Sequence, residues 1–295
     1  MFLSVFDMFK IGIGPSSSHT MGPMLAGARF LDHLRTLPFE VAGLSARLHG
    51  SLAHTGIGHA TDRATILGLA GVVPHNYDAE KAAQILIENR DTKRLHPQGL
   101  PDLRFDPLSD LVFDFGPNLD GHANGMVLSA TDPQGDIIAQ QTYYSIGGGF
   151  VVTDAELDKA SDTEQATRVP FPFATAADML AMARRSGKTI AEMKAANESQ
   201  CQSKTALQDG LTRIWTVMND CINRGLMAQG PLPGGLNVRR RAHAIHEALT
   251  AEKGLNIVAP HTINDWIGVY AMAVNEENAA GGQVVTAPTN GAAGV

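Results

Sequence analysis

The sequence predicts an α+β N-terminal domain with an antiparallel sheet, followed by an all-α region. In the first half, short strand-like runs are separated by glycine, proline and asparagine, whereas the second half carries long-period apolar spacing and strong helix formers. A chain of 295 residues is long enough for two domains with cores of their own. We place the first domain at residues 1–154, a linker at 155–172 and the helical region at 173–295.

Composition and charge narrow the class of protein. Hydrophobic residues at 44% and charged residues at 18% are ordinary for a soluble globular enzyme, and no apolar run of about 18 residues could span a bilayer. The first seven residues lack the basic start of a secretory signal, so we expect a cytoplasmic protein. A net charge of −7 disfavours a nucleic-acid or anionic-membrane partner, and residues 239–241 form the single arginine cluster.

The first half alternates between helix and strand patterns. Apolar spacing predicts a helix over 21–37, and period-two alternation predicts a strand over 41–50. A glycine-containing loop over 50–63 should then lead into a second helix, which Thr61 and Asp62 are expected to cap. A short helix and four strands are expected further on, at 78–89, 103–105, 110–115, 125–130 and 136–145.

The second half is expected to be helical at 174–186, 190–200, 205–224, 239–253 and 261–280. Two apparent nucleotide motifs fail. The glycines at 147–149 lack dinucleotide spacing, and the Gly187-Lys188-Thr189 run has Met182 where a Walker A loop needs its first glycine. His243 and His246 lack a third metal ligand in sequence, which favours a solvated or core role for both.

Two polar stretches have the composition of binding loops. Residues 14–20, Gly-Pro-Ser-Ser-Ser-His-Thr, precede a helix, where small hydroxyls and free N–H groups suit a carboxylate or phosphate beside a titratable imidazole. An ordinary N-cap loop is the alternative. Residues 275–295, rich in glycine, alanine, asparagine and threonine, indicate a tightly packed binding loop, and a helix end followed by a turn is the alternative there.

Several motifs occur along this sequence in the same order as in one known family. The sequence resembles the iron–sulfur-dependent L-serine dehydratases (L-serine ammonia-lyases) in their single-chain form. That family has an N-terminal β domain, similar to the regulatory serine-binding domain of some phosphoglycerate dehydrogenases, followed by a helical catalytic domain. The residues that carry the resemblance are 6–10, 12–20, 58–62, 142–150, 232–235 and 275–294.

The resemblance implies a lyase of amino-acid catabolism and gluconeogenesis that converts L-serine to pyruvate and ammonia. Removing water from serine needs a base for the Cα proton and a Lewis acid for the hydroxide, which in this family is a [4Fe–4S] cluster. We also expect a homo-oligomer, because an incomplete helical region should expose apolar faces that drive association. L-serine is the implied small-molecule substrate.

The resemblance also implies site residues. His59 is the first candidate for the base and His19 the second, because a neutral imidazole suits proton transfer near pH 7. The implied substrate-binding residues are Ser16, Ser17, Ser18, Thr20, Thr61, Ser145, Gly147, Gly148, Thr289, Asn290 and Gly291.

The cysteines depart from the family pattern. The family's cluster-binding cysteines follow the motif at 287–291, and this chain stops at Val295, so we expect an incomplete catalytic domain without cluster ligands or turnover. Cys201 and Cys221 have no CxxC spacing, which suits a reducing compartment. A serine-binding or partner-binding module without turnover is the alternative. A pyridoxal-phosphate dehydratase is disfavoured because no lysine has the context of a Schiff base.

Overall fold

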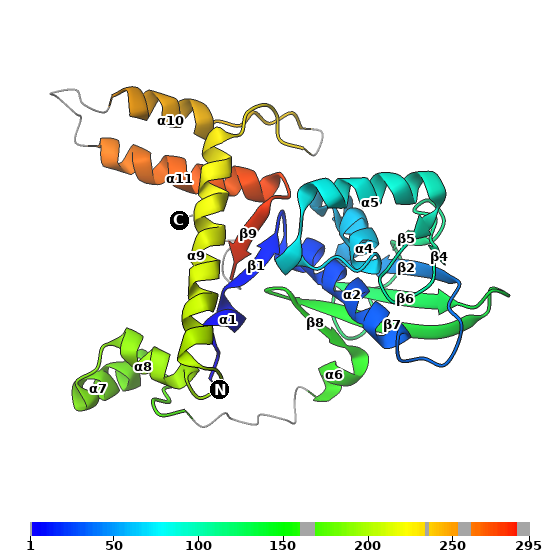
Figure 1. Ribbon diagram of the computed structural model, residues 1–295, viewed down its shortest axis with the longest axis horizontal. Helices are drawn as coiled ribbons and strands as arrows, with labels where there is room; N and C mark the ends of the chain where they lie inside the picture. Colours follow the sequence, from blue (N-terminus) through cyan, green and yellow to red (C-terminus); the bar gives the residue numbers. More distant parts are fainter. Residues whose placement is uncertain (1, 160–168, 234–235, 253–260, 288–295) are drawn as a thin grey trace.

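The computed structural model describes residues 2–159, 169–233, 236–252 and 261–287. An α/β region comes first along the chain and a helical region follows it, which agrees with the predicted order (Figure 1). Among the described residues, no helix is both long enough and apolar enough to cross a bilayer.

A seven-stranded sheet underlies the first region, in the order β3-β4-β2-β6-β7-β8, with β5 also paired to β2. β2 runs antiparallel to β6 but parallel to β4 and β5, so the sheet is mixed where the sequence predicted an antiparallel one. The parallel pairs arise because helices separate β2 from β4 and β5 along the chain. The strands are β2 (Gly43–His49), β3 (Arg94–Leu95), β4 (Leu103–Arg104), β5 (Leu111–Asp114), β6 (Gly125–Thr131), β7 (Ile137–Gly147) and β8 (Phe150–Thr153).

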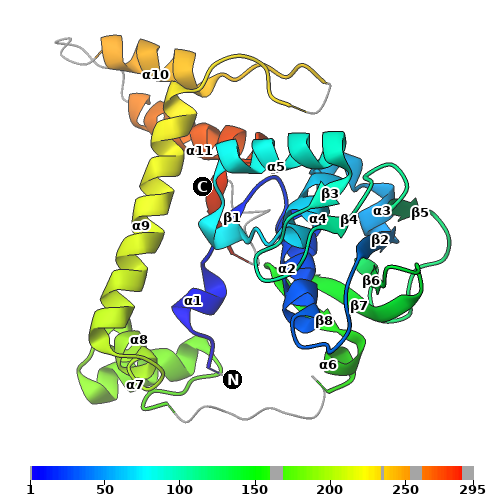
Figure 2. The same cartoon turned by 45° about the vertical axis from the view of Figure 1, so that its right-hand side comes forward.

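Helices α2 (Gly22–Leu34) and α4 (Thr61–Leu69) cover one face of this sheet, and α5 (Ala79–Thr92) packs beside α4 (Figures 1 and 2). α2 and α4 touch where glycines meet, because a Cβ on Gly27 would lie 2.7 Å from the carbonyl carbon of Gly68. The core between helices and sheet is made of large buried apolar side chains, among them Phe30, Leu31, Leu34, Leu44, Leu48, Leu69 and Leu128.

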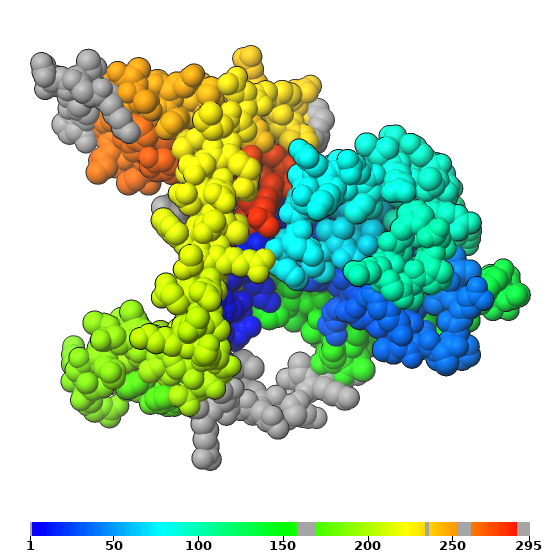
Figure 3. Space-filling view, in the orientation of Figure 1, coloured from blue at the N-terminus to red at the C-terminus, as the bar shows by residue number. Residues whose placement is uncertain are grey.

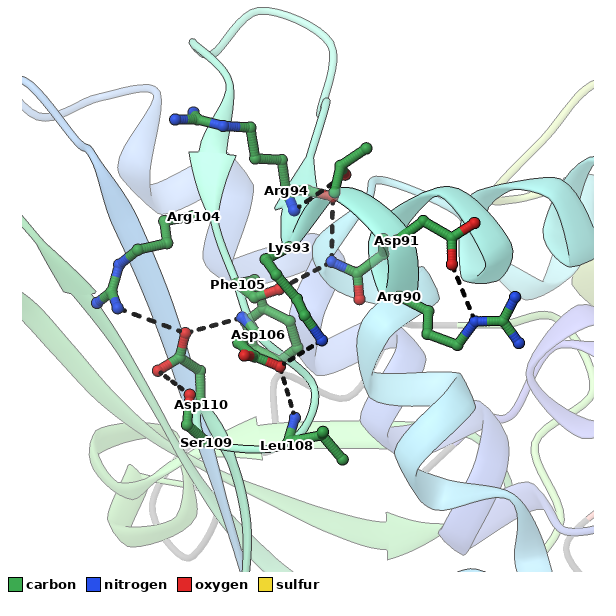
Figure 4. A network of polar contacts seen from close by, with 12 residues as sticks. Arg90, Asp91, Lys93, Arg94, Arg104, Phe105, Asp106, Leu108, Ser109 and Asp110 are labelled. Atoms are coloured by element: carbon green, nitrogen blue, oxygen red, sulfur yellow. Dashed lines mark hydrogen bonds and ion pairs between the residues drawn. The ribbon is translucent and has the colours of Figure 1, made fainter.

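A polar network fastens the edge of the sheet to the end of α5 (Figure 4). Lys93 ends that helix in a left-handed conformation, and its Nζ lies 3.0 Å from Asp106 Oδ1. The amide of the buried Asn89 donates to the carbonyl oxygens of Arg94 and Phe105. The edge strands β3 and β4 are therefore held by side chains as well as by their short ladder.

The helical region contains the five helices that the sequence predicted. The longest, α9, is crossed by α11 in the half toward its C-terminal end, and α10 lies beside α11 (Figure 1). Their bounds are α7 (Ala176–Ser186), α8 (Ile190–Glu198), α9 (Lys204–Met227), α10 (Ala242–Ala251) and α11 (Thr262–Ala279), and the shorter helices of the chain are α1 (Val5–Met8), α3 (Ser51–His54), α6 (Asp154–Lys159), η1 (Ser17–Met21), η2 (Ile57–His59) and η3 (Pro74–Asn76).

A two-stranded antiparallel ladder connects the regions. β1 (Lys10–Ile13) pairs with β9 (Gln283–Thr286), in the register Lys10 to Thr286. In Figure 3 this ladder, blue and red, fills the space between α9 and α5. The stretch predicted as a binding loop thus contains a strand.

The N-terminal segment packs on the helical region. Glu198 at the end of α8 accepts hydrogen bonds from Ser4 Oγ at 2.8 Å and from the Val5 N–H. A Cβ on Gly210 of α9 would come within 2.6 Å of the Phe6 ring. The division into domains at 1–154 and 173–295 stays a prediction, and residues 4–6 and 10–13 contact the second of these regions.

Candidate active site

The serine run forms the first helical turn, where the sequence predicted a loop ahead of the helix. It adopts a π-helical turn, η1, which runs directly into α2. Ser16 is the N-cap, and its Oγ accepts a hydrogen bond from the His19 N–H at 3.2 Å. π-helical turns occur frequently at functional sites. The turn brings the hydroxyls of residues 16–18 and the imidazole of His19 to one end of α2.

The second polar loop enters α4 differently from the prediction that Thr61 and Asp62 cap it. The N-cap is Ala60, which is left-handed at φ 52° and makes no side-chain cap. Thr61 is already the first residue of the helix, so its hydroxyl is free to donate elsewhere, and it donates to the carbonyl of His19 at 2.7 Å. The capping prediction was wrong by one residue.

The two histidines face each other. The ring centroids of His19 and His59 lie 4.8 Å apart, with an interplanar angle of 36°. His59 Nδ1 lies 2.9 Å from the carbonyl oxygen of Thr55. Because a carbonyl only accepts, the neutral His59 ring carries its proton on Nδ1 and leaves the lone pair on Nε2.

His19 is held at both ring nitrogens. Nδ1 lies 2.8 Å from Ser18 Oγ, and Nε2 lies 2.8 Å from Ser51 Oγ. Burial lowers the pKa of His19, and the charge that His59 can carry lowers it further. The lowered pKa favours the neutral form of the His19 ring.

Two threonines join the loops by a reciprocal exchange of hydrogen bonds. Thr20, next to His19, donates through its hydroxyl to the carbonyl of His59 at 2.8 Å, while Thr61 donates to the carbonyl of His19 at 2.7 Å. Both threonines are buried. Since each hydroxyl has one proton, both donors are already used within the protein. The exchange fixes the backbones of the two histidines relative to each other.

A cleft of about 200 Å³ lies beside these loops. Asn278, near the end of α11, is tied to the lining residue Pro15, because its Nδ2 donates to the Pro15 carbonyl at 3.1 Å. A Cβ on Gly14 would collide with the carbonyl of Asn278, so this close approach requires glycine. The lining comes from both loops and from the end of α11, and includes Gly14, Pro15, Thr20, Gly58, Ala60, Asp62, Arg63 and Gly281.

The other predicted site residues lie in three places. Among the described residues the half-buried Ser17 makes no side-chain hydrogen bond, and the hydroxyl of buried Ser145 likewise has no partner there. Ser145 packs against Gly22, at the start of α2. Gly147 ends β7 and Gly148 begins the turn of the β7–β8 hairpin, and both have positive φ and lie outside the cleft lining. Thr289, Asn290 and Gly291 lie outside the described residues.

Ser51, which contacts His19, was not predicted as a site residue from the sequence. A single serine after a strand carries no motif signal of its own. What places it beside His19 is the turn at Gly50, which has φ 55° and no room for a Cβ beside the carbonyl of Ala123. The positive φ could not be predicted from the glycine alone.

A buried acidic pair supports the α11 side of the cleft. Glu277 binds Arg240 at 3.0 Å and Arg224 at 3.1 Å. Glu276 accepts from the backbone N–H groups of Arg241 and Ala242, where α10 begins. Two residues of the predicted basic cluster are thus tied to α11.

The described residues do not fit an iron–sulfur cluster. Cys201 is exposed, whereas Cys221 is buried in α9, and burial raises its pKa to about 11, which disfavours the thiolate that binds iron. Within the described ranges, no three His, Cys, Asp or Glu side chains come together as a metal site. His243 contacts the Gln229 side chain and the Leu226 carbonyl through its two ring nitrogens.

The two thiols are expected to differ at least tenfold in their rate of alkylation at pH 8. The raised pKa keeps Cys221 protonated in the folded state until the pH approaches 11, and its side chain is buried. Mass spectrometry after timed iodoacetamide treatment would follow each site, with the denatured chain as the control. Equal rates in the folded protein would contradict the burial of Cys221.

Comparison with known proteins defines the class to which this fold and histidine site belong. The serine dehydratase beta chain family matches residues 4–156, and the serine dehydratase alpha chain family matches residues 185–295. The chain belongs to the serine dehydratase family.

Several relatives are named L-serine dehydratases. The chain is 43% identical to the L-serine dehydratase of Streptomyces coelicolor over 297 residues, 42% to that of Haemophilus influenzae over 296, and 41% to L-serine dehydratase 1 of Escherichia coli K12 over 296. These alignments cover 99–100% of this chain and 64% of each relative, so the chain spans just under two thirds of their length.

Proposed function

We propose that this chain binds L-serine and contributes the substrate-binding and proton-abstracting part of an L-serine ammonia-lyase. The observation that carries the proposal is the pairing of His19 and His59 at 4.8 Å, from two loops that are 40 residues apart in sequence. The membership of the chain in the serine dehydratase family supports L-serine as the ligand.

The proposed roles follow from the hydrogen-bonding groups of the site that have no partner among the described residues. His59 Nε2 has the available lone pair, so His59 takes the Cα proton of serine. The Ser17 hydroxyl, which makes no hydrogen bond among the described residues, and the backbone N–H groups at the start of η1 receive the carboxylate. Elimination then expels the β-hydroxyl as water and gives aminoacrylate, which hydrolyses to pyruvate and ammonia.

The iron–sulfur cluster that the family resemblance implies would supply the Lewis acid for the departing hydroxide. Because the described residues do not fit it, the proposal assigns no residue of this chain to the cluster. For the chain by itself, the Ser17 hydroxyl and the N–H groups at the start of η1 support a second candidate function, serine binding without turnover.

Calorimetry with L-serine, run beside a pyruvate assay, tests the proposal. We expect saturable binding of L-serine and weaker binding of D-serine, because the carboxylate and the Cα proton must both face the two loops. Binding without pyruvate would support the second candidate. Absence of binding together with absence of pyruvate would overturn both.

The expected homo-oligomer stays a prediction. It is supported by large apolar side chains that the helical region exposes, since such patches promote association. Trp215 of α9 is 66% exposed, and Ile263 and Ile267 of α11 are 67% and 52% exposed.

A further inference from the structure

Ser51 occupies a rigid corner beside the imidazole pair. It begins α3 directly after β2, and its backbone N–H donates to the carbonyl of Ala123 at 2.8 Å. Gly50 makes the turn with φ 55°, against the carbonyl of Ala123. The position of Ser51 is therefore set by the sheet region and not by the serine turn at residues 16–20.

The hydroxyl of Ser51 contacts Nε2 of the His19 ring. The Oγ to Nε2 distance is 2.8 Å, while Nδ1 of the same ring contacts Ser18, its neighbour in sequence. Ser18 and His19 lie in the same helical turn, so the Ser18 contact does not fix the ring relative to the rest of the protein. The Ser51 contact fixes the ring to a second element, so it restrains rotation of the imidazole relative to the sheet.

The His19 ring also packs beside the ring of His59. The two rings lie 4.8 Å apart, and the His59 ring has its own hydrogen bond to the Thr55 carbonyl, one helical turn after Ser51. Since a hydroxyl can donate or accept, Ser51 satisfies Nε2 in either neutral tautomer and in the protonated ring. Its hydroxyl can hold the ring in place while the protonation of His19 changes.

We propose that Ser51 is a positioning residue that fixes the His19 imidazole against His59, so that the pair presents one geometry to the substrate. The consequence for turnover rests on the proposed function, whereas the effect on the ring does not. Hydrogen bonds between side chains on different rigid elements are a means of holding such groups within the narrow geometry that catalysis needs.

The test uses the 295-residue chain labelled with ¹⁵N at histidine, as wild type, Ser51→Ala, Ser51→Thr and the surface control Ser109→Ala. The His19 ring signals are identified by their loss in His19→Gln. We expect Ser51→Ala to shift the Nε2 signal of His19 by several ppm and to perturb the His59 ring, to leave other histidines unchanged, and to be reversed in part by Ser51→Thr. The thermal unfolding midpoint should change little.

Two results would overturn the assignment. One is an unchanged His19 Nε2 signal in Ser51→Ala. The other is a uniform change in all histidine signals together with a large fall in the unfolding midpoint, which would make Ser51 a residue of the fold alone.

Activity provides a separate readout. In protein that forms pyruvate, Ser51→Ala is expected to lower kcat about tenfold with KM within a factor of two, because ring orientation matters most in the transition state. If L-serine neither binds nor reacts while the His19 ring still depends on Ser51, the proposed function fails and the positioning role stands.

Discussion

Replacing His59 by alanine is expected to lower kcat for L-serine about 10²-fold or more in protein that forms pyruvate, because loss of a general base acts on the transition state. We propose His59 as the base because its Nε2 has no hydrogen-bond partner among the described residues, and a supporting role for His19 because both of its ring nitrogens contact hydroxyls. Initial rates of pyruvate formation across serine concentrations would separate kcat from KM.

His54→Ala is the matched control, since His54 is an exposed histidine of the same loop whose ring packs on Phe115 at 5.3 Å. It should leave kcat within a factor of two. A nearly unchanged kcat in His59→Ala, with a large loss in His19→Ala, would move the base to His19.

Replacing Glu277 by glutamine is expected to destabilise the protein by about 3 kcal/mol. The carboxylate is buried between Arg240 and Arg224, and the Arg240 side chain is only 10% exposed. Removing one partner of a buried ion pair leaves an uncompensated charge, which typically costs about 3–5 kcal/mol. Urea unfolding followed by circular dichroism would measure the difference in unfolding free energy.

Glu247→Gln provides the comparison, because Glu247 is 68% exposed and its ion pair with His243 is long, at 3.5 Å. Exposed pairs contribute about 0–1 kcal/mol. If the two variants lose equal stability, the buried cluster does not support the α11 side of the cleft in the way its geometry indicates.

The helices and most of the strands could be predicted because their signals are local. Apolar spacing over 11 or more residues located α9 and α11, and period-two alternation located β2, whose Leu44, Ala46 and Leu48 are buried as expected. The parallel pairing of β2 could not be predicted from such patterns, since it depends on where the chain returns after α5.

The features that could not be predicted from the sequence depend on contacts between residues far apart along the chain. β9 is four residues long, and its partner β1 lies about 270 residues earlier, so neither shows a pattern that names the other. The serine turn and His59 were predicted as site residues from the family motifs. Their spatial pairing, the threonine exchange and the Ser51 contact arise only where separate elements meet.

We propose above that L-serine binds beside the paired imidazoles of His19 and His59. Titrating L-serine into the ¹⁵N-histidine-labelled chain, with ring signals recorded at each step, tests it most directly and needs no turnover. We predict that the signals of His19 and His59 shift with one common midpoint, while those of His243 and His246, which lie on α10, stay in place. Unmoved His19 and His59 signals at serine concentrations that saturate the calorimetric binding would contradict the claim.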